Sequence, residues 1–241
     1  MTLHLQQCAH GGVHLCIPAK MRGVSCYNKR MAKGKFITFE GPDGSGKTTV
    51  STAVTKRLES EGYAVRYTRE PGGSVIAEQI RNIILDPANT AEDARTEALL
   101  YAASRRQHLV DVVLPDLYKG ISVISDRFID SSLAYQGCGR GLGIEAVYAI
   151  NQFAIEGHMP DKTIFLNVPA ELGLARIQKN RTSLDRLDQE ALSFHKAVYD
   201  GYQKVIRMYA DRMIIIDASR DVDTVIEDAY RAVKDILDGC R

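Results

Sequence analysis

Gly41-Pro42-Asp43-Gly44-Ser45-Gly46-Lys47-Thr48 decides the fold, because it fits the pattern G-x4-G-K-[ST] at every position. A short apolar run over residues 36–40 precedes it, and a helical pattern over residues 48–58 follows it. A glycine-rich turn of this spacing between a strand and a helix is typical of a loop that binds the phosphates of a nucleoside triphosphate. The sequence therefore predicts a phosphate-binding loop within an α/β fold.

The residue types in this loop suit ATP together with Mg²⁺. Its glycines let successive backbone N–H groups point inward at anionic oxygens, and the following helix adds its positive N-terminal end. We expect the loop from Gly41 to Thr49 to contact the ATP phosphates, with Lys47 reaching the β- and γ-phosphates. The Thr48 hydroxyl is expected to bind Mg²⁺.

Away from the loop, short apolar runs alternate with longer helical stretches, which is the pattern of βα units in a parallel sheet. Further strands are expected over residues 63–68, 121–125, 163–168 and 213–216, and helices over 96–118, 192–209 and 222–236. Pro115 should kink or break the end of the first of these helices. We interpret the glycines at 137, 139, 141 and 143 as a flexible connector.

These elements predict a doubly wound parallel sheet flanked by helices, of the P-loop NTPase type, in a single domain over residues 35–241. Residues 1–34 differ from this domain, because they contain no Asp or Glu and show no helical or alternating period. We expect a disordered extension. An import sequence and a working start at Met31 are the alternatives.

Composition excludes several classes of function. The 241 residues carry a net charge of +1, with 45% hydrophobic and 25% charged residues, so no strong field would attract nucleic acid or an anionic membrane. No apolar run approaches the roughly 18 residues that span a bilayer. Five cysteines at scattered spacings fit neither a disulfide framework nor a zinc site. We expect free thiols, a cytoplasmic location, and no nucleic-acid or membrane partner.

Two charged residues follow the strand expected over 121–125. Asp126 could hold Mg²⁺ through water, and the alternative is a carboxylate that caps the next helix. Arg127 lies where open α/β sheets bind ligands, at the carboxyl end of a strand. Its planar guanidinium suits bidentate recognition of a phosphate.

Three further segments indicate a pocket for a second nucleotide. Arg69 follows the second strand in Thr-Arg-Glu-Pro-Gly-Gly, Arg105 lies on the long helix after Tyr101 and Ser104, and hydroxyl, aromatic and amide side chains follow Arg127. Arginines bind phosphate or a base carbonyl, and an aromatic ring can stack on the base.

Together these segments resemble the thymidylate kinases over nearly the whole of residues 35–238. The resemblance rests on F-E-G-P-D-G-S-G-K-T-T at 39–49, T-R-E-P-G-G at 68–73, A-A-S-R-R-Q-H-L at 102–109, D-R-F-I-D-S-S-L-A-Y-Q-G at 126–137 and L-D-R-L-D-Q-E at 184–190. It implies an ATP-dependent nucleoside monophosphate kinase that transfers the γ-phosphoryl group of ATP to dTMP, giving dTDP and ADP in dTTP biosynthesis. It also implies a homodimer.

The resemblance implies roles for individual residues. Asp43 would contact the deoxyribose 3′-hydroxyl, and Arg127 would bind and orient the acceptor phosphate. Arg105 would hydrogen-bond a thymine carbonyl, and the Tyr135 ring would crowd the 2′ position of the sugar. Further acceptor-side residues are Arg69, Arg81, Tyr101, Ser104, Ser132 and Gln136, with Tyr101 standing where many relatives carry a stacking Phe.

A small mobile lid over about residues 175–188 is also implied. Such a lid often donates an arginine when the phosphate loop lacks one, and Gly44 stands where some relatives carry that arginine. Arg181 is the favoured catalytic donor. Arg176, Lys179 and Arg186 are the other candidates, and a solvated basic loop is the alternative.

We expect catalysis by alignment and charge neutralisation through Lys47, Arg127, Mg²⁺ and the lid arginine, because an acceptor phosphate needs no strong general base. Two other functions remain open. A deoxynucleoside kinase would need a carboxylate base and fewer acceptor-side arginines. A P-loop switch or regulatory ATPase would bind nucleotide and report to a protein partner.

Overall fold

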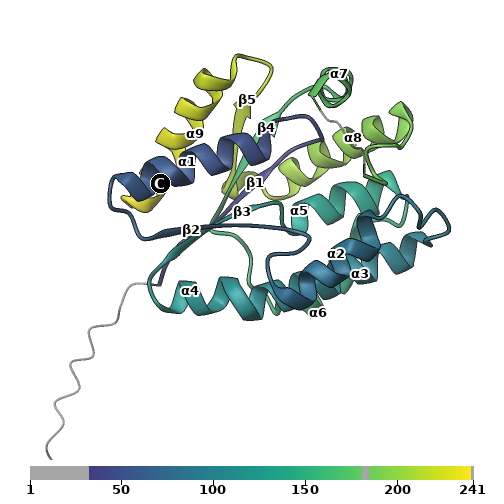
Figure 1. Ribbon diagram of the computed structural model, residues 1–241, viewed down its shortest axis with the longest axis horizontal. Coiled ribbons are helices and arrows are strands. Elements are labelled where there is room, and N and C mark those ends of the chain that lie inside the picture. Colours follow the sequence, from purple (N-terminus) through teal and green to yellow (C-terminus); the bar gives the residue numbers. More distant parts are fainter. Residues whose placement is uncertain (1–32, 181–184, 240–241) are drawn as a thin grey trace, which may run out of the picture. The chain divides into compact units, whose positions relative to one another are not determined.

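Parallel strands at the centre of the fold carry the loop that the sequence predicts. The computed structural model describes residues 33–180 and 185–239, so almost all of the predicted extension, and Arg181 in the lid, lie outside the described residues. Within these ranges five strands form one sheet in the order β2-β3-β1-β4-β5 (Figure 1). The strands are β1 Phe36–Glu40, β2 Val65–Arg69, β3 Ser122–Asp126, β4 Lys162–Asn167 and β5 Met213–Asp217.

Every neighbouring pair in this sheet is parallel, and each strand lies within two residues of its predicted bounds. The register pairs Phe39 of β1 with Asp126 of β3. The phosphate loop after β1 and the Asp-Arg pair at the end of β3 therefore meet at one edge of the sheet. The prediction of a doubly wound α/β sheet is confirmed.

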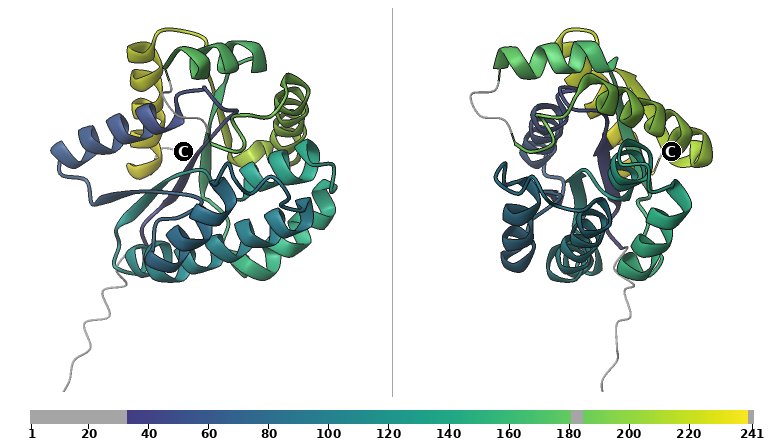
Figure 2. Two further views of the ribbon diagram at one scale, coloured as in Figure 1. Left: turned by 45° about the vertical axis from the view of Figure 1, so that its right-hand side comes forward. Right: turned by 90° about the vertical axis from the view of Figure 1, so that its right-hand side faces the viewer.

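Helices α1 (Lys47–Ser60) and α9 (Val222–Leu237) pack together on one face of the sheet (Figures 1 and 2). Helix α1 buries Val50, Val54 and Leu58 at intervals of four residues, against Ile37 and Phe39 of the central strand. This spacing places all three apolar side chains on one helical stripe. The stripe fixes α1, and with it the end of the phosphate loop, to the sheet.

The opposite face is covered by a second group of elements. The longer ones are α2 (Val75–Leu85), α3 (Ala94–His108), α6 (Ile144–Ile155) and α8 (Leu192–Met208). The shorter ones are η1 (Leu109–Val113), α4 (Leu114–Tyr118), α5 (Ile129–Ser132), η2 (Leu133–Gly139) and η3 (Ala210–Arg212), and α7 (Ala170–Asn180) follows β4. None of the described helices has the length and apolar character needed to cross a bilayer.

Two local expectations have different outcomes. The helix expected over 96–118 changes to π geometry in η1 and returns to α geometry in α4, with Pro115 in the first turn of α4. The kink or break expected at Pro115 stays a prediction. The flexible connector is wrong for Gly137 and Gly139, which belong to the π-helix η2. A Cβ on Gly139 would lie 2.8 Å from the Phe194 ring, so this glycine permits the close packing of α8.

Candidate active site

The phosphate loop joins β1 to α1 and touches the first turn of α7. Gly44 has a φ of 75°, and a Cβ placed on it would lie 2.1 Å from the carbonyl oxygen of Gly173. Both the left-handed backbone and the contact exclude a side chain at this position. The structure thereby explains why an arginine at the position of Gly44, expected in some relatives, has no space in this chain.

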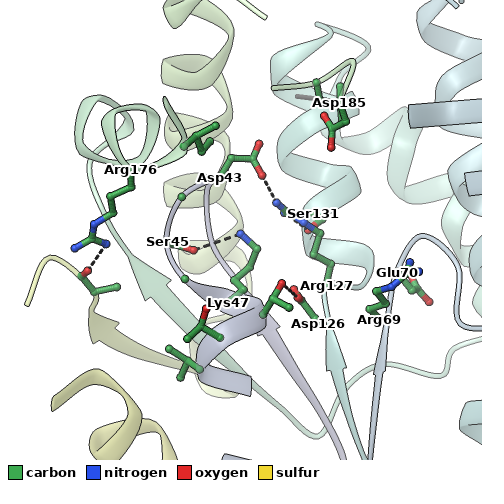
Figure 3. Close-up of a pocket in the computed structure, with 18 of the residues that line it drawn as sticks. Asp43, Ser45, Lys47, Arg69, Glu70, Asp126, Arg127, Ser131, Arg176 and Asp185 are labelled. Atoms are coloured by element: carbon green, nitrogen blue, oxygen red, sulfur yellow. Dashed lines mark hydrogen bonds and ion pairs between the residues drawn. The ribbon is translucent and has the colours of Figure 1, made fainter. Parts of the chain in front are cut away.

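Lys47 is buried within the loop, and its ammonium group is held by neutral oxygens. Nζ donates to the carbonyl oxygen of Pro42 at 2.8 Å and to Oγ of Ser45 at 3.3 Å (Figure 3). Burial, and then the charge of Arg127, lowers the pKa of Lys47 to about 8. A desolvated cation beside a turn of backbone N–H groups is a strong attractor for phosphate oxygens.

The Thr48 hydroxyl and the Asp126 carboxylate meet directly. Thr48 Oγ1 donates to Asp126 Oδ2 at 2.5 Å. The other oxygen, Oδ1, is buried and has no hydrogen-bond partner within the described residues. A hydroxyl beside an unsatisfied carboxylate oxygen suits a hard divalent cation, because Mg²⁺ prefers oxygen ligands. The two residues predicted to hold Mg²⁺ are thus adjacent and fit that ion.

Arg127 occupies a strained backbone position at the edge of the sheet. Its φ is 73°, which is uncommon for a residue other than glycine. The guanidinium forms an ion pair with Asp43, and it donates to the hydroxyls of Ser131, Tyr202 and Tyr135 at 3.0, 3.2 and 3.1 Å. Burial alone would lower the pKa of Arg127, but Tyr135 and Asp43 raise it well above its ordinary value. This guanidinium therefore stays charged.

Asp43 connects the phosphate loop to the acceptor side. It accepts the Tyr135 hydroxyl at 2.7 Å in addition to the guanidinium of Arg127. Burial alone would raise the pKa of Asp43, but the charges of Arg127 and Lys47 outweigh burial and lower that pKa below its ordinary value. The structure thus brings together three residues that the sequence assigned to the sugar and the acceptor phosphate.

Arg69 and Arg81 form a second concentration of positive charge. Both donate to the carbonyl oxygen of Pro71, at 2.8 and 2.9 Å, and Arg69 also pairs with Glu78 at 3.0 Å. Burial, and then the charge of Arg69, lowers the pKa of Arg81 from its ordinary value. Two guanidinium groups that share one carbonyl attract an anion, and phosphate is the anion that suits their fork geometry.

A cavity of about 700 Å³ runs along these groups. The phosphate loop and Thr48 line one part of it, and Arg69, Arg81 and Tyr101 line another. Tyr135 and Gln136 also face this cavity. The amide of Gln136 donates from Nε2 to the buried Glu97 at 2.8 Å. The volume is in the range of sites that enclose small organic ligands.

Ser104, Arg105 and Ser132 do not line the cavity but lie behind its wall. Arg105 is 1% exposed and donates to Glu70 at 2.8 Å and to Ser132 at 3.0 Å. Its guanidinium also donates to the side chain of Asn151 and to the carbonyl oxygen of Phe128. The Ser104 hydroxyl accepts from the backbone N–H of Gly72 at 3.1 Å and donates to the carbonyl oxygen of Ala77 at 3.3 Å. The direct base contact of these three residues stays a prediction.

The lid candidates have separate positions. Arg181 lies outside the described residues. Arg176 in α7 lines the cavity and donates to the carbonyl oxygens of Ala218 and Ser219 at 2.8 and 3.3 Å (Figure 3). Arg186 instead contacts two buried carboxylates on the α2–α3 side and does not line the cavity. Lys179 is exposed. Among the described candidates, Arg176 alone reaches the cavity.

Sequence reasoning missed the part of the cavity beside β5. Arg176 shares it with Ala218, Arg220, Asp221, Val222 and Val225. No motif marks these residues. Their position could still have been predicted, because ligands of open α/β sheets bind beyond the carboxyl ends of strands. Tyr202 was missed as well, since it lies in an apolar helical stripe that carries no chemical signal.

Known proteins agree with this geometry. The family model described as thymidylate kinase matches residues 39–229. Thymidylate kinase of Geobacillus sp. is 53% identical over 208 residues, which are 86% of this chain and 99% of that protein. Thymidylate kinase of Lactobacillus delbrueckii subsp. bulgaricus is 57% identical over 205 residues, which are 84% and 96% of the two chains.

A solved structure extends the comparison to the fold. The crystal structure of thymidylate kinase from Ehrlichia chaffeensis superposes with a TM-score of 0.67 at 32% identity, covering 84% of this chain and 99% of that one. The fold of this chain therefore agrees with the sequence comparisons. The chain belongs to the thymidylate kinase family of ATP-dependent nucleoside monophosphate kinases.

Proposed function

We propose that the cavity holds ATP and dTMP end to end and that the γ-phosphoryl group passes between them, giving ADP and dTDP. The observation that carries this proposal is the continuity of the cavity, from the phosphate loop with Lys47 to the guanidinium groups of Arg69 and Arg81. A cavity lined by cations from both the donor loop and the acceptor side suits two anionic substrates whose phosphates meet between these cations.

The donor end takes the triphosphate on the loop from Gly41 to Thr49, with Lys47 on its terminal phosphates. Arg176 and the loop after β5 form the remaining wall of this end. A flat base fits there, because the Arg176 guanidinium is a planar group held in place by two carbonyl oxygens.

The acceptor end takes the monophosphate on Arg127, with Arg69 and Arg81 beside it. Asp43 and Tyr135 face the deoxyribose in this arrangement, and Tyr101 and Gln136 face the base. Arg105, with Ser104 and Ser132, contributes from behind the wall. Four of its five N–H groups have acceptors among the described residues, so Arg105 supports the wall that faces the base.

Thr48 and Asp126 are the residues that would hold Mg²⁺, as the free Oδ1 of Asp126 supports. When bound, the ion neutralises charge on the donor phosphates. The chain's own contribution is alignment. Lys47 and Arg127 draw two anionic groups together, and a positioned arginine from the lid, which we propose is Arg181, would stabilise the transferring group.

A coupled assay of ADP release tests the reaction, with dTMP, dUMP, UMP, AMP or thymidine as acceptor. We expect turnover that depends on dTMP and little response to thymidine, UMP or AMP. Turnover with thymidine would favour a deoxynucleoside kinase. ATP hydrolysis that ignores every acceptor would favour a P-loop switch, and either result would overturn the acceptor assignment.

We also propose a homodimer and a single cytoplasmic domain over residues 35–241 behind an extension at 1–34. Large apolar side chains on α2, α3 and α6 support the dimer, because Ile83, Leu99 and Phe153 are 50%, 56% and 91% exposed. Sedimentation of the full chain, compared with that of the Phe153→Glu variant, tests the homodimer. A monomeric parent chain would contradict it.

A further inference from the structure

The carboxylate of Glu40, the last residue of β1, is a point where four hydrogen-bond donors converge. Oε1 accepts the backbone N–H groups of Phe128 at 2.7 Å and Ser131 at 3.3 Å. Oε2 accepts the hydroxyls of Ser131 at 2.6 Å and Tyr202 at 2.9 Å. Glu40 is fully buried and does not line the cavity, so it cannot itself touch a substrate bound there.

Both of these hydroxyls also contact Arg127. Nη1 of Arg127 donates to Ser131 Oγ at 3.0 Å and to the Tyr202 hydroxyl at 3.2 Å. A hydroxyl has one hydrogen, and Glu40 accepts from both of these hydroxyls, which also lie 2.9 Å from one another. The lone pairs of both oxygens are therefore left for the guanidinium. Glu40 thus makes both hydroxyls acceptors for the N–H groups of Arg127.

The same carboxylate holds the backbone of Arg127. The left-handed conformation of this residue, with φ at 73°, persists only where the surrounding structure enforces it. Its own N–H donates to the carbonyl oxygen of Phe39 at 2.9 Å, and the next N–H, that of Phe128, donates to Glu40. Both peptide groups that flank Arg127 are therefore fixed by the end of β1.

An ionised carboxylate accepts four bonds without donating one, whereas an amide must donate. An amide would turn its NH₂ group toward the two hydroxyls and force their hydrogens toward the guanidinium, where they repel its N–H groups. The charged groups that act on Glu40 are Arg127, Asp130, Lys47 and Arg212, and Asp130 is paired with Arg212.

We propose that Glu40 is a positioning residue for phosphoryl transfer, which aims Arg127 at the acceptor phosphate through Ser131 and Tyr202. The proposal rests on the proposed role of Arg127. It predicts that loss of a single hydroxyl, far from the triphosphate loop in sequence, slows turnover without weakening ATP binding.

Tyr202→Phe is the central variant, and Tyr230→Phe is its matched control. The Tyr230 hydroxyl also donates to a carboxylate, that of Glu61, at 2.7 Å, but it lies on α9, and the cation that contacts it is Lys234 and not Arg127. We expect Tyr202→Phe to lower kcat with dTMP on the order of 10- to 100-fold, because small errors of alignment cost that much. The KM for ATP and the thermal midpoint should match those of Tyr230→Phe.

Glu40→Gln and the double variant with Tyr202→Phe complete the test. Since both changes act through Arg127, the double variant should be little slower than the slower single variant. Independent, multiplying losses would overturn the proposal. So would a kcat of Tyr202→Phe equal to that of Tyr230→Phe. If Glu40→Gln fails to fold, Ser131→Ala takes its place in the cycle.

Arg127→Ala separates this proposal from the one it rests on. Full activity of Arg127→Ala would overturn the acceptor-phosphate role, and the positioning role with it. An inactive Arg127→Ala beside fully active Tyr202→Phe and Glu40→Gln would overturn the positioning role alone.

Discussion

Replacement of Gly44 by alanine tests the contact between the phosphate loop and α7. The new Cβ would start 2.1 Å from the Gly173 carbonyl oxygen, whereas real Cβ atoms essentially never come closer than 3.0 Å to such an atom. Either the loop or α7 must therefore move by about 1 Å, and both contacting atoms belong to backbone that cannot rotate away.

Two costs add in this variant. A left-handed backbone costs an L side chain roughly 1–2 kcal/mol. Forced displacement of packed atoms costs roughly 1–3 kcal/mol more. Gly62 is the matched control, because its φ is 88° and nothing lies within 4 Å of a Cβ built there. Gly62→Ala should show only the first cost, so the difference between the variants measures the contact with Gly173.

Urea denaturation and steady-state ADP release measure the two consequences. We expect Gly44→Ala to lose roughly 2–5 kcal/mol of unfolding free energy and Gly62→Ala roughly 1–2 kcal/mol. A displacement of about 1 Å in the phosphate loop should also lower kcat roughly 100-fold in the first variant alone. Equal losses of stability in the two variants, with kcat unchanged in both, would refute this reasoning.

Four further outcomes follow from the site. Lys47→Ala should lower kcat roughly 100- to 1,000-fold while leaving the thermal midpoint close to that of the parent chain, and normal kcat would contradict the role of its ammonium group. Arg176→Ala should raise the KM for ATP roughly 10-fold and leave the KM for dTMP unchanged, which initial-rate kinetics with each substrate varied would check. Asp126→Asn should raise the Mg²⁺ concentration for half-maximal rate roughly 10-fold or more, and an unaltered magnesium titration would remove Asp126 from the metal site. Burial, and then Asp130, raises the pKa of Glu40 from 4.5 to about 7, so this group stabilises the fold fully below pH 4.5 and loses that contribution as the pH rises through 7. Between pH 5 and pH 8 the parent chain should therefore lose up to about 3 kcal/mol of stability that Glu40→Gln, which has no group titrating there, does not lose, and a pH-independent difference in urea denaturation would speak against the raised pKa.

The sequence was most informative where chemistry and spacing are local. The phosphate loop is one continuous stretch, so its residues, the strand before it and the helix after it were all predictable. Asp126 and Arg127 were predictable for a related reason, because the carboxyl ends of parallel strands lie on one edge of the sheet. Their pairing with Thr48 and Asp43 follows from that shared edge.

Positions that depend on distant partners were not predictable. The helical period places Arg105 on an inward face, but it does not reveal that Glu70 and Asn151, 35 and 46 positions away, engage its guanidinium. Arg176 was one of four lid candidates, and nothing in its own segment shows that the loop after β5 holds it. Glu40 stands directly before a strong motif, yet its partners lie near residues 130 and 202.

The four bonds to Glu40 also bear on how the site forms as the chain folds. They join residues 88 to 162 positions apart, and the Arg127–Asp43 pair spans 84. Closing loops of this length costs entropy that only a nearly complete fold returns. The phosphate loop is by contrast continuous in sequence, and its contact with α7 involves a residue that precedes α8 in the chain. A chain still short of α8 can therefore form its donor loop while Arg127 lacks Tyr202, so the capacity to hold a triphosphate arises before the capacity to use it.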